Sequence, residues 1–326
     1  MPRSYDPAVS AHPPLGRPVF EPVNRVPALA ALRSAVQRQD WAAVAATFDA
    51  LPREQDRPAA CRVVADTEGA EEFLGRIVAQ RPGDPLARAL LADRFVQIGW
   101  NIRSGYGAEH VSKDQFRDFH AYLRRAEVLL IDVCAEYPAF GLAWYLRVLT
   151  ARGLELGQSE ARRRYARLAE HHPHHYSGQS QLLQKLCPKW GGSWEAAHGF
   201  AWEVTVSAPA GSPNGALVAL AQMEQWLELD GDAAREAYLR EPVQAQRLRD
   251  AAARSVLHPE ARPDDPLAVG AHSAFAAVHS LAGRHAEAAP HFRALGDHAH
   301  EFPWVYVKGG HEAAFVRHRK LALAKG

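Results

Sequence analysis

A lysine and a tryptophan stand directly before two glycines in the segment LCPKWGGSWEAAHGF, residues 186–200. Glycine-rich loops that cradle phosphates follow a β-strand and carry their lysine after the glycines, in the order G-x-x-x-x-G-K-[ST]. Here Lys189 and Trp190 precede Gly191 and Gly192, and the residues before them have the apolar spacing of a helix. This order argues against a nucleotide site and makes Lys189 and Trp190 candidates for ligand contacts at a turn.

The same segment contains the residues that a turn between two helices needs. Pro188 disfavours helical backbone at the residue before it, so the preceding helix should end near Leu186. Gly191 and Gly192 can supply the positive φ that ends a helix, and the Ser193 hydroxyl can cap the next one. We therefore expect two helices joined by this turn.

A second group of candidates lies where two expected helices are separated by more residues than a turn requires. The segment NIRSGYGAEHV, at about residues 101–111, is an insertion between them, and Ser112 can cap the second helix. Trp100, Arg103 and Tyr106 could form a ledge that holds a peptide by stacking and by bidentate contact with a carboxylate. In the structural alternative, Trp100 fills the groove between helix pairs and Arg103 fastens the loop. Insertions in repeat arrays often map to the binding face.

Other clusters of reactive side chains have less support as sites. EHHPHHY contains several histidines, but Pro173 interrupts the helix between them and no carboxylate or cysteine is spaced to complete a zinc site. GDHAHEF lacks the H-E-x-x-H spacing of a metalloprotease. The run ARRRYARL distributes Arg162, Arg163, Arg164 and Arg167 around a helix, where most should form a solvated face. The sequence contains no nucleophile elbow, dinucleotide fingerprint or calcium loop.

These candidates must be positioned by helices, because helix-period apolar spacing runs through most of the chain. In VPALAALRSAVQRQDWAAVAATF, apolar residues recur at intervals of one helical turn. Alternating β-branched runs are missing, and FPWVYV at residues 302–307 is the only strand candidate. The sequence therefore predicts an all-α fold.

Within the helical pattern, three successive units place a proline twelve residues after an alanine. The pairs are Ala126 with Pro138, Ala161 with Pro173, and Ala197 with Pro209. The prolines are 35 and 36 residues apart, which is close to the tetratricopeptide period. A small residue in the second helix lets the first helix approach closely, and proline ends each pair because it cannot continue a helix.

These units resemble tetratricopeptide-like repeats over roughly residues 24–300. The Lys-Trp-Gly-Gly-Ser segment, followed by Phe200 and Ala201 in the next helix, is also similar to a family of uncharacterised bacterial helical-repeat proteins. This second resemblance covers about residues 85–230. It implies a helical-repeat fold and carries no catalytic residues to this chain.

Bulk composition limits the classes of function. The net charge of +1 and the pI of about 7.9 provide no overall field for nucleic acid or an anionic membrane. The chain lacks a signal peptide and a long apolar run, and its three distant cysteines suit buried thiols, so we expect a cytoplasmic protein. Residues 1–23 should form a proline-rich irregular leader, residues 24–300 the repeat domain, and residues 301–326 a C-terminal extension.

The sequence thus predicts an all-α protein whose antiparallel helix-pair repeats stack into a TPR-like superhelix, an α-solenoid. We expect a non-enzymatic scaffold that binds a protein or peptide in a concave groove lined by the first helices. The expected binding residues are Trp100, Arg103, Tyr106, Trp144, Lys189 and Trp190. No catalytic residue, metal or cofactor is assigned, and the oligomeric state is left open.

The rival interpretation is an enzyme or an auxiliary subunit. Its small-molecule pocket would be formed by the 101–111 insertion and the loop at Lys189 and Trp190. The titratable residues of such a pocket would be His110, Lys113, Lys189 and His198, which would have to lie within hydrogen-bond reach of one another.

Overall fold

The computed structural model describes residues 16–105 and 110–326. This part of the chain is all-helical, as the sequence predicts, with seventeen α-helices and no strand. The first nine are α1 (Pro27–Gln37), α2 (Trp41–Asp49), α3 (Arg57–Ala65), α4 (Ala70–Gln80), α5 (Pro85–Arg103), α6 (Lys113–Glu136), α7 (Gly141–Gly153), α8 (Gln158–His171) and α9 (Tyr176–Leu186). The others are α10 (Trp194–Ser207), α11 (Ala216–Glu228), α12 (Asp232–Arg240), α13 (Pro242–Arg254), α14 (Ala268–Leu281), α15 (His285–Leu295), α16 (Glu301–Trp304) and α17 (His311–Lys325). The strand candidate at residues 302–307 lies in α16 and the turn after it.

Short polar side chains fix where several helices begin. Asp40 accepts a hydrogen bond from the backbone N–H of α2, and Asp84 does the same for α5, whose first residue is Pro85. Ser112 forms a reciprocal capping box with the third residue of α6, and the Ser193 hydroxyl accepts from the backbone of α10. The two expected serine caps are therefore confirmed.

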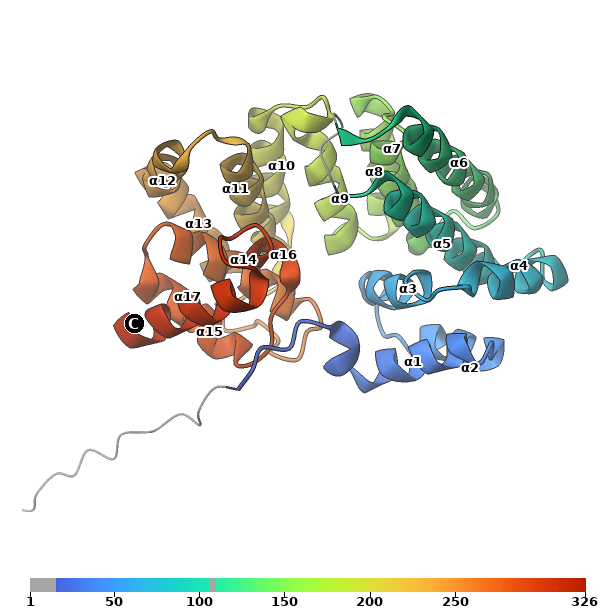
Figure 1. Cartoon of the computed structure of the whole chain (residues 1–326), viewed down its shortest axis with the longest axis horizontal. Helices are drawn as coiled ribbons and strands as arrows, with labels where there is room; N and C mark the ends of the chain where they lie inside the picture. Colours follow the sequence, from blue (N-terminus) through green and yellow to red (C-terminus); the bar gives the residue numbers. More distant parts are fainter. Residues whose placement is uncertain (1–15, 106–109) are drawn as a thin grey trace, which may run out of the picture.

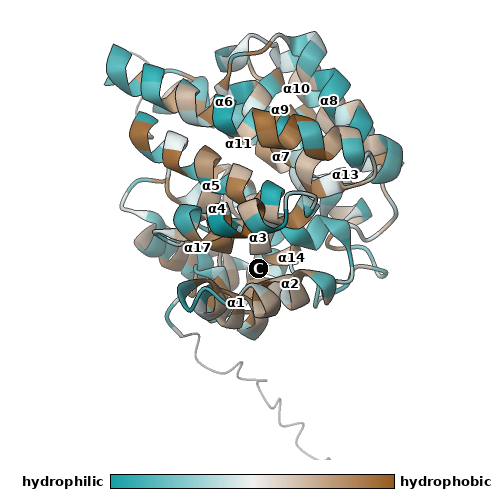
Figure 2. Ribbon diagram, turned by 90° about the vertical axis from the view of Figure 1, so that its right-hand side faces the viewer, coloured by the Kyte–Doolittle hydropathy of each residue, from teal (hydrophilic) through white to brown (hydrophobic). Residues whose placement is uncertain are grey.

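Successive helices pack as hairpins, and the hairpins pack on one another. The hairpins α5–α6, α7–α8, α9–α10, α11–α12 and α14–α15 each bring two neighbouring helices together. The first helix of each hairpin also contacts the first helix of the next, so α5, α7, α9, α11 and α14 follow one another side by side. Figure 2 shows the resulting difference in hydropathy, with α7 mostly hydrophobic and α6 and α8 largely hydrophilic.

Small residues allow the close approach of helices that the repeat pattern requires. Ala126 in α6, Ala161 in α8 and Ala197 in α10 are all 0% exposed. Around them the buried side chains form one core cluster from the first helices to α8 and a second from α7 to α14, and these clusters include the three cysteines, which are free and buried as expected. Because these alanines are fully buried between closely packed helices, a larger side chain at their positions would not fit without displacing a neighbour.

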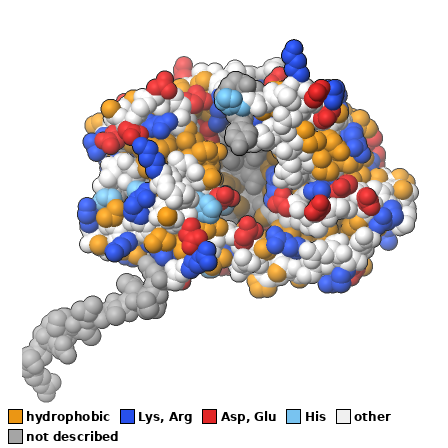
Figure 3. Space-filling view, viewed as in Figure 1, with side chains coloured by type: hydrophobic (Ala, Val, Ile, Leu, Met, Phe, Trp, Pro, Cys, Tyr) orange, Lys and Arg blue, Asp and Glu red, His pale blue; other side chains and the backbone are white. Residues whose placement is uncertain are grey.

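The early part of the chain lies against its late part. Val19 donates its backbone N–H to the Asp297 carbonyl at 2.7 Å, and Arg17 forms a bidentate pair with Glu312. A second contact joins the Arg53 guanidinium to the Asp265 carboxylate at 2.6 Å. The helices therefore follow a closed course, with the blue and red ends of the described chain adjacent (Figure 1). Figure 3 shows that the face seen in this view is hollowed near its centre.

Among the described residues, no helix combines the length and the apolar composition that crossing a membrane would require.

Candidate binding site

Ionisable side chains from four helices that are distant in sequence lie within electrostatic reach of one another. They are Arg62 of α3, Asp93 of α5, Tyr145 and Arg152 of α7, and Glu224 of α11. Three of these helices, α5, α7 and α11, belong to the row of first helices, and the fourth, α3, packs directly on α5. We call the side on which these residues meet the inner face.

Two tryptophans and two arginines form the most distinctive group on the inner face. The rings of Trp100 and Trp190 have centroids 6.5 Å apart and are nearly perpendicular, at 88°. The Arg152 guanidinium carbon lies 5.3 Å from the centroid of Trp100 and 5.5 Å from that of Trp190, so it fills the corner between the two rings. Arg103 stacks on Trp100 at 5.5 Å. These four residues, the indole–guanidinium cluster, join α5, α7 and the turn after α9.

Close helix packing places Trp100 at this position. Trp100 lies in the last turn of α5, where its ring contacts Phe119 of α6 with centroids 4.8 Å apart. A Cβ atom on Gly153 of α7 would lie 2.6 Å from the Leu123 side chain and 3.4 Å from Trp100. Glycine at that position therefore lets α7 approach both neighbours, which holds the indole ring against the end of α7 that carries Arg152.

The turn after α9 positions Trp190, and it does so differently from the expectation in one respect. Residues Pro188–Trp190 form a 3-10 turn that ends at Gly191, whose φ is +80° as predicted. Gly192 does not have positive φ, so that part of the prediction is wrong. It is required for another reason: a Cβ atom there would lie 1.9 Å from the Leu186 carbonyl oxygen. The backbone of the turn folds back directly onto the end of α9.

Lys189 contacts the inner face through α11. Its Nζ lies 2.5 Å from the Glu224 carboxylate, whose side chain is 4% exposed. Gln184 of α9 donates to the other oxygen of Glu224. The Trp190 carbonyl in turn accepts from Lys185 and from Gln158, both at 3.1 Å. Lys189 and the turn are thus fixed in place by α8, α9 and α11.

Trp144 is an expected binding residue that lies apart from the cluster. Trp144 lies eight residues before Arg152 on α7, about 12 Å away along the helix axis. Its indole N–H donates to the Pro138 carbonyl at 2.8 Å, and its ring lines a separate cavity of about 350 Å³ together with Arg163 and Arg167. Tyr106 lies outside the described residues. The structure therefore brings together Trp100, Arg103 and Trp190, with Lys189 next to them.

The titratable residues of the rival pocket have other partners. His198 contacts Gln225 at 2.6 Å and the Tyr238 hydroxyl at 3.3 Å, while Lys189 pairs with Glu224. Burial lowers the pKa of His198, so its imidazole is neutral at pH 7. His110 and Lys113 are exposed residues before and at the start of α6.

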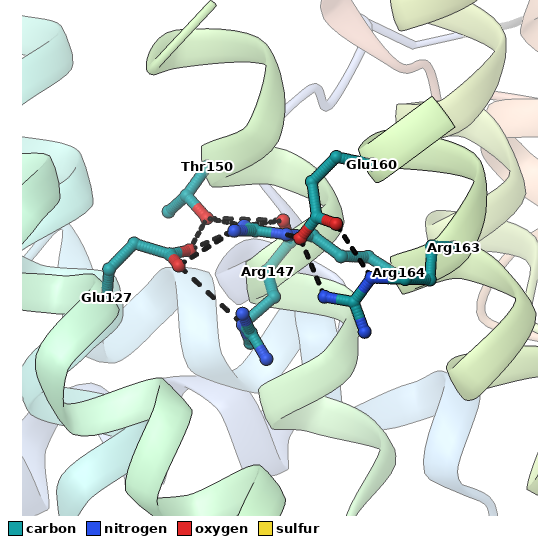
Figure 4. Close-up of polar contacts among 6 residues, drawn as sticks. All are labelled: Glu127, Arg147, Thr150, Glu160, Arg163 and Arg164. Atoms are coloured by element: carbon teal, nitrogen blue, oxygen red, sulfur yellow. Dashed lines mark hydrogen bonds and ion pairs between the residues drawn. The ribbon is translucent and has the colours of Figure 1, made fainter. Parts of the chain in front are cut away.

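A buried polar network ties together the helices behind the cluster (Figure 4). Arg164 of α8 donates two hydrogen bonds to the Glu127 carboxylate of α6, at 2.7 and 2.9 Å, and one to Glu160 at 2.8 Å. Thr150 and Arg147 of α7 contact the same Glu127 carboxylate. The expectation that most arginines of ARRRYARL are solvated fits Arg163, which is 53% exposed in its side chain. Arg164 departs from it because α6 supplies a buried carboxylate at that position.

A second buried polar group, in α14 and α15, consists of three histidines. The Nδ1 atoms of His272 and His291 lie 3.0 Å apart, and the rings of His279 and His291 stack at 5.9 Å. Burial lowers the pKa of His272 to about 4 and that of His279 to about 3. Burial also lowers the pKa of His291, and the two neighbouring histidines add to this effect. His272 also lines a cavity of about 380 Å³. All three histidines are therefore neutral at pH 7.

None of the five inner-face residues was predicted from the sequence, and Arg152 and Asp93 are two of them. Asp93 is 2% exposed, and one of its carboxylate oxygens has no hydrogen-bond partner in the described chain. Asp93 is the one acidic residue of α5, and Arg152 is one of two arginines in the mainly apolar α7, a signal that could have marked them as functional.

Among the described residues, no group of three or more histidine, cysteine, aspartate or glutamate side chains is arranged to hold a metal ion. The chain matches no family model, and the comparisons with curated proteins and with solved structures likewise gave no match. The side chains of the inner face offer stacking on two indole rings and hydrogen bonding from guanidinium groups.

Proposed function

We propose that this chain is a non-enzymatic helical-repeat scaffold, a TPR-like α-solenoid, whose concave inner face binds an extended protein or peptide segment. The contacts between successive first helices and the buried alanines of α6, α8 and α10 support the repeat arrangement. In such an array the first helices line the concave side, and extended segments bind there through a few anchoring contacts.

The indole–guanidinium cluster is the observation that carries this proposal. Trp100 and Trp190 are both partly exposed and converge from segments that are ninety residues apart. Tryptophan and arginine are the residues most enriched among the anchors that dominate binding energies, because they combine a large apolar surface with directional hydrogen bonds. A rigid corner of two indoles suits an apolar side chain or a peptide plane of the bound segment.

The rival enzyme needs a general acid or base beside a substrate pocket. Lys189 is engaged by a buried carboxylate, and His198 is engaged by an amide and a phenol. These contacts favour a structural role for both residues, so we prefer the binding scaffold.

The test is selection of binders from a random peptide display library on the full chain, followed by affinity measurement with variants. We expect Trp100→Ala and Trp190→Ala each to weaken the selected peptides by at least tenfold, which corresponds to about 1.4 kcal/mol. Trp226→Ala is the matched control, because Trp226 also stacks on an arginine, Arg235, at 5.0 Å, but belongs to α11 and α12. A library that yields no binder, or binders indifferent to both cluster variants, would refute the proposal.

A further inference from the structure

The Arg152 guanidinium forms no hydrogen bond or close ion pair within the described chain, although Glu224 and Tyr145 interact with it electrostatically. Its Nε atom is buried without a hydrogen-bond partner, and its contacts are the faces of Trp100 and Trp190. A guanidinium has five N–H donors in a planar fork, and donors that are removed from water without partners cost free energy. Arg152 therefore meets the conditions of a preorganised receptor that lacks its acceptor.

The charges around Arg152 define what the acceptor would be. Glu224 lies within electrostatic reach of Arg152, but its carboxylate is already held by Lys189 and Gln184. Arg103, Arg62 and Lys185 are the other positive charges near Arg152, and Arg62 is compensated by Asp93 and Asp66. The surroundings of Arg152 are thus positively charged while the nearest carboxylate is already engaged, which suits an anionic acceptor.

The two indole rings also select the shape of the acceptor. Both rings pack against the guanidinium, and its N–H donors lie in one plane because the group itself is planar. A carboxylate matches this arrangement, since its two oxygens accept parallel hydrogen bonds from adjacent guanidinium nitrogens. Burial lowers the pKa of Arg152, with Glu224 acting in the opposite direction, and a bound anion would offset that loss of hydration.

We infer that Arg152 is a carboxylate-recognition site of the inner face, and that the bound segment presents a carboxylate to it between Trp100 and Trp190. This inference rests on the proposed peptide-binding function and specifies the partner chemistry. The carboxylate has two sources in a peptide, its C-terminus and an acidic side chain, and both present the same pair of oxygens.

The experiment is a titration of the ¹⁵N-labelled full chain, observing the arginine Nε–H and indole N–H signals. N-acetylglycine represents a C-terminal carboxylate, N-acetylaspartate α-methylamide represents an acidic side chain, and N-acetylglycinamide is the neutral control. We expect saturable shifts of the Arg152 Nε–H and Trp190 indole signals with at least one carboxylate, the tighter of the two identifying the source. The amide should bind at least tenfold more weakly. This comparison uses the unmodified chain, so it does not depend on a variant that folds.

Arg152→Lys keeps the charge and removes the fork, so it should weaken the carboxylate at least tenfold. Arg117→Lys is the matched control, because Arg117 is 66% exposed on α6 and pairs with Asp114 and Asp118. Equal binding of the amide, full affinity in Arg152→Lys, or tighter binding of methyl phosphate would each overturn the inference. If library peptides depend on Trp100 and Trp190 but no carboxylate shifts these signals, the proposed function stands and the carboxylate site does not. If carboxylates bind but the library yields no binder, the carboxylate site stands and the proposed peptide-binding function does not.

Discussion

Acid should destabilise this protein through the three buried histidines of α14 and α15. The pKa values of His272, about 4, and His279, about 3, lie below the 6.5 of an unfolded chain. A group with a lowered pKa stabilises the fold above its unfolded pKa, and this contribution falls as pH drops because the unfolded chain takes up the proton first. The loss therefore begins near pH 6.5 and continues to about pH 4 for His272 and about pH 3 for His279.

The size of the effect follows from proton linkage. For each proton that only the unfolded chain binds, the free energy of unfolding falls by about 1.4 kcal/mol per pH unit. Between pH 6.5 and pH 5 each histidine therefore lowers it by about 2 kcal/mol. His272 and His279 together give about 4 kcal/mol at pH 5, a large part of the stability of an ordinary domain. The charged groups around His279 are Glu287 at 3.2 Å, Arg284 at 3.3 Å and, farther away, Arg249; the Arg284 guanidinium donates to the imidazole, which keeps that nitrogen unprotonated.

Urea unfolding followed by circular dichroism at pH 7, 6 and 5 measures this loss. His279→Gln should reduce the difference in unfolding free energy between pH 7 and pH 5 by about 2 kcal/mol. His171→Gln, at an exposed position of α8, should leave that difference unchanged. The reasoning fails if the unmodified protein is equally stable at pH 5 and 7, or if His279→Gln keeps the full pH dependence.

Three further sets of substitutions test the packing of the chain, each by its unfolding free energy. Gly192→Ala should cost about 2–3 kcal/mol because its Cβ would clash with a backbone carbonyl. Gly191→Ala should cost about 1–2 kcal/mol, because its Cβ would meet nothing within 4 Å but the backbone φ is +80°. Equal losses would contradict this account. Glu127→Leu should cost about 3–5 kcal/mol because the buried Arg164 loses two hydrogen bonds to a carboxylate and keeps only Glu160 as a carboxylate partner. Arg164→Met in that background should recover most of the loss, and no recovery would mean that the pair is not coupled. Arg53→Ala should cost about 1 kcal/mol and raise amide hydrogen exchange in α1, α2 and α14. Unchanged exchange in these helices would show that the contact of Arg53 with the loop before α14 does not hold the early and late parts of the chain together.

The sequence could predict the features that depend on neighbouring residues. Ser112 and Ser193 cap helices because each acts on the backbone of its own segment, and Pro188 ends α9 through the residue directly before it. The insertion was found because α5 and α6 have clear ends. Trp100, Arg103 and Trp190 were selected for their types and positions, but their contact with one another is a fact of packing.

Features that depend on partners from other helices could not be predicted in the same way. Arg164 looks like its solvated neighbours in sequence, and only the position of Glu127 across the helix interface makes it a core residue. Gly192 is constrained by the Leu186 carbonyl and not by its own φ. Arg152 is the penultimate residue of the mainly apolar α7, and its importance comes from two indoles contributed by α5 and the turn after α9.

The contacts between the early and late parts of the chain have a consequence for how its length can change. Arrays with free ends gain or lose units by duplication and deletion, since each unit touches only its neighbours. Here Arg17 meets a residue 295 positions away and Arg53 one 212 positions away, so one hairpin more or fewer would pull both pairs apart. The number of hairpins is thus set by the contacts between the early and late segments of the described chain. Variation in length should concentrate in the loops instead.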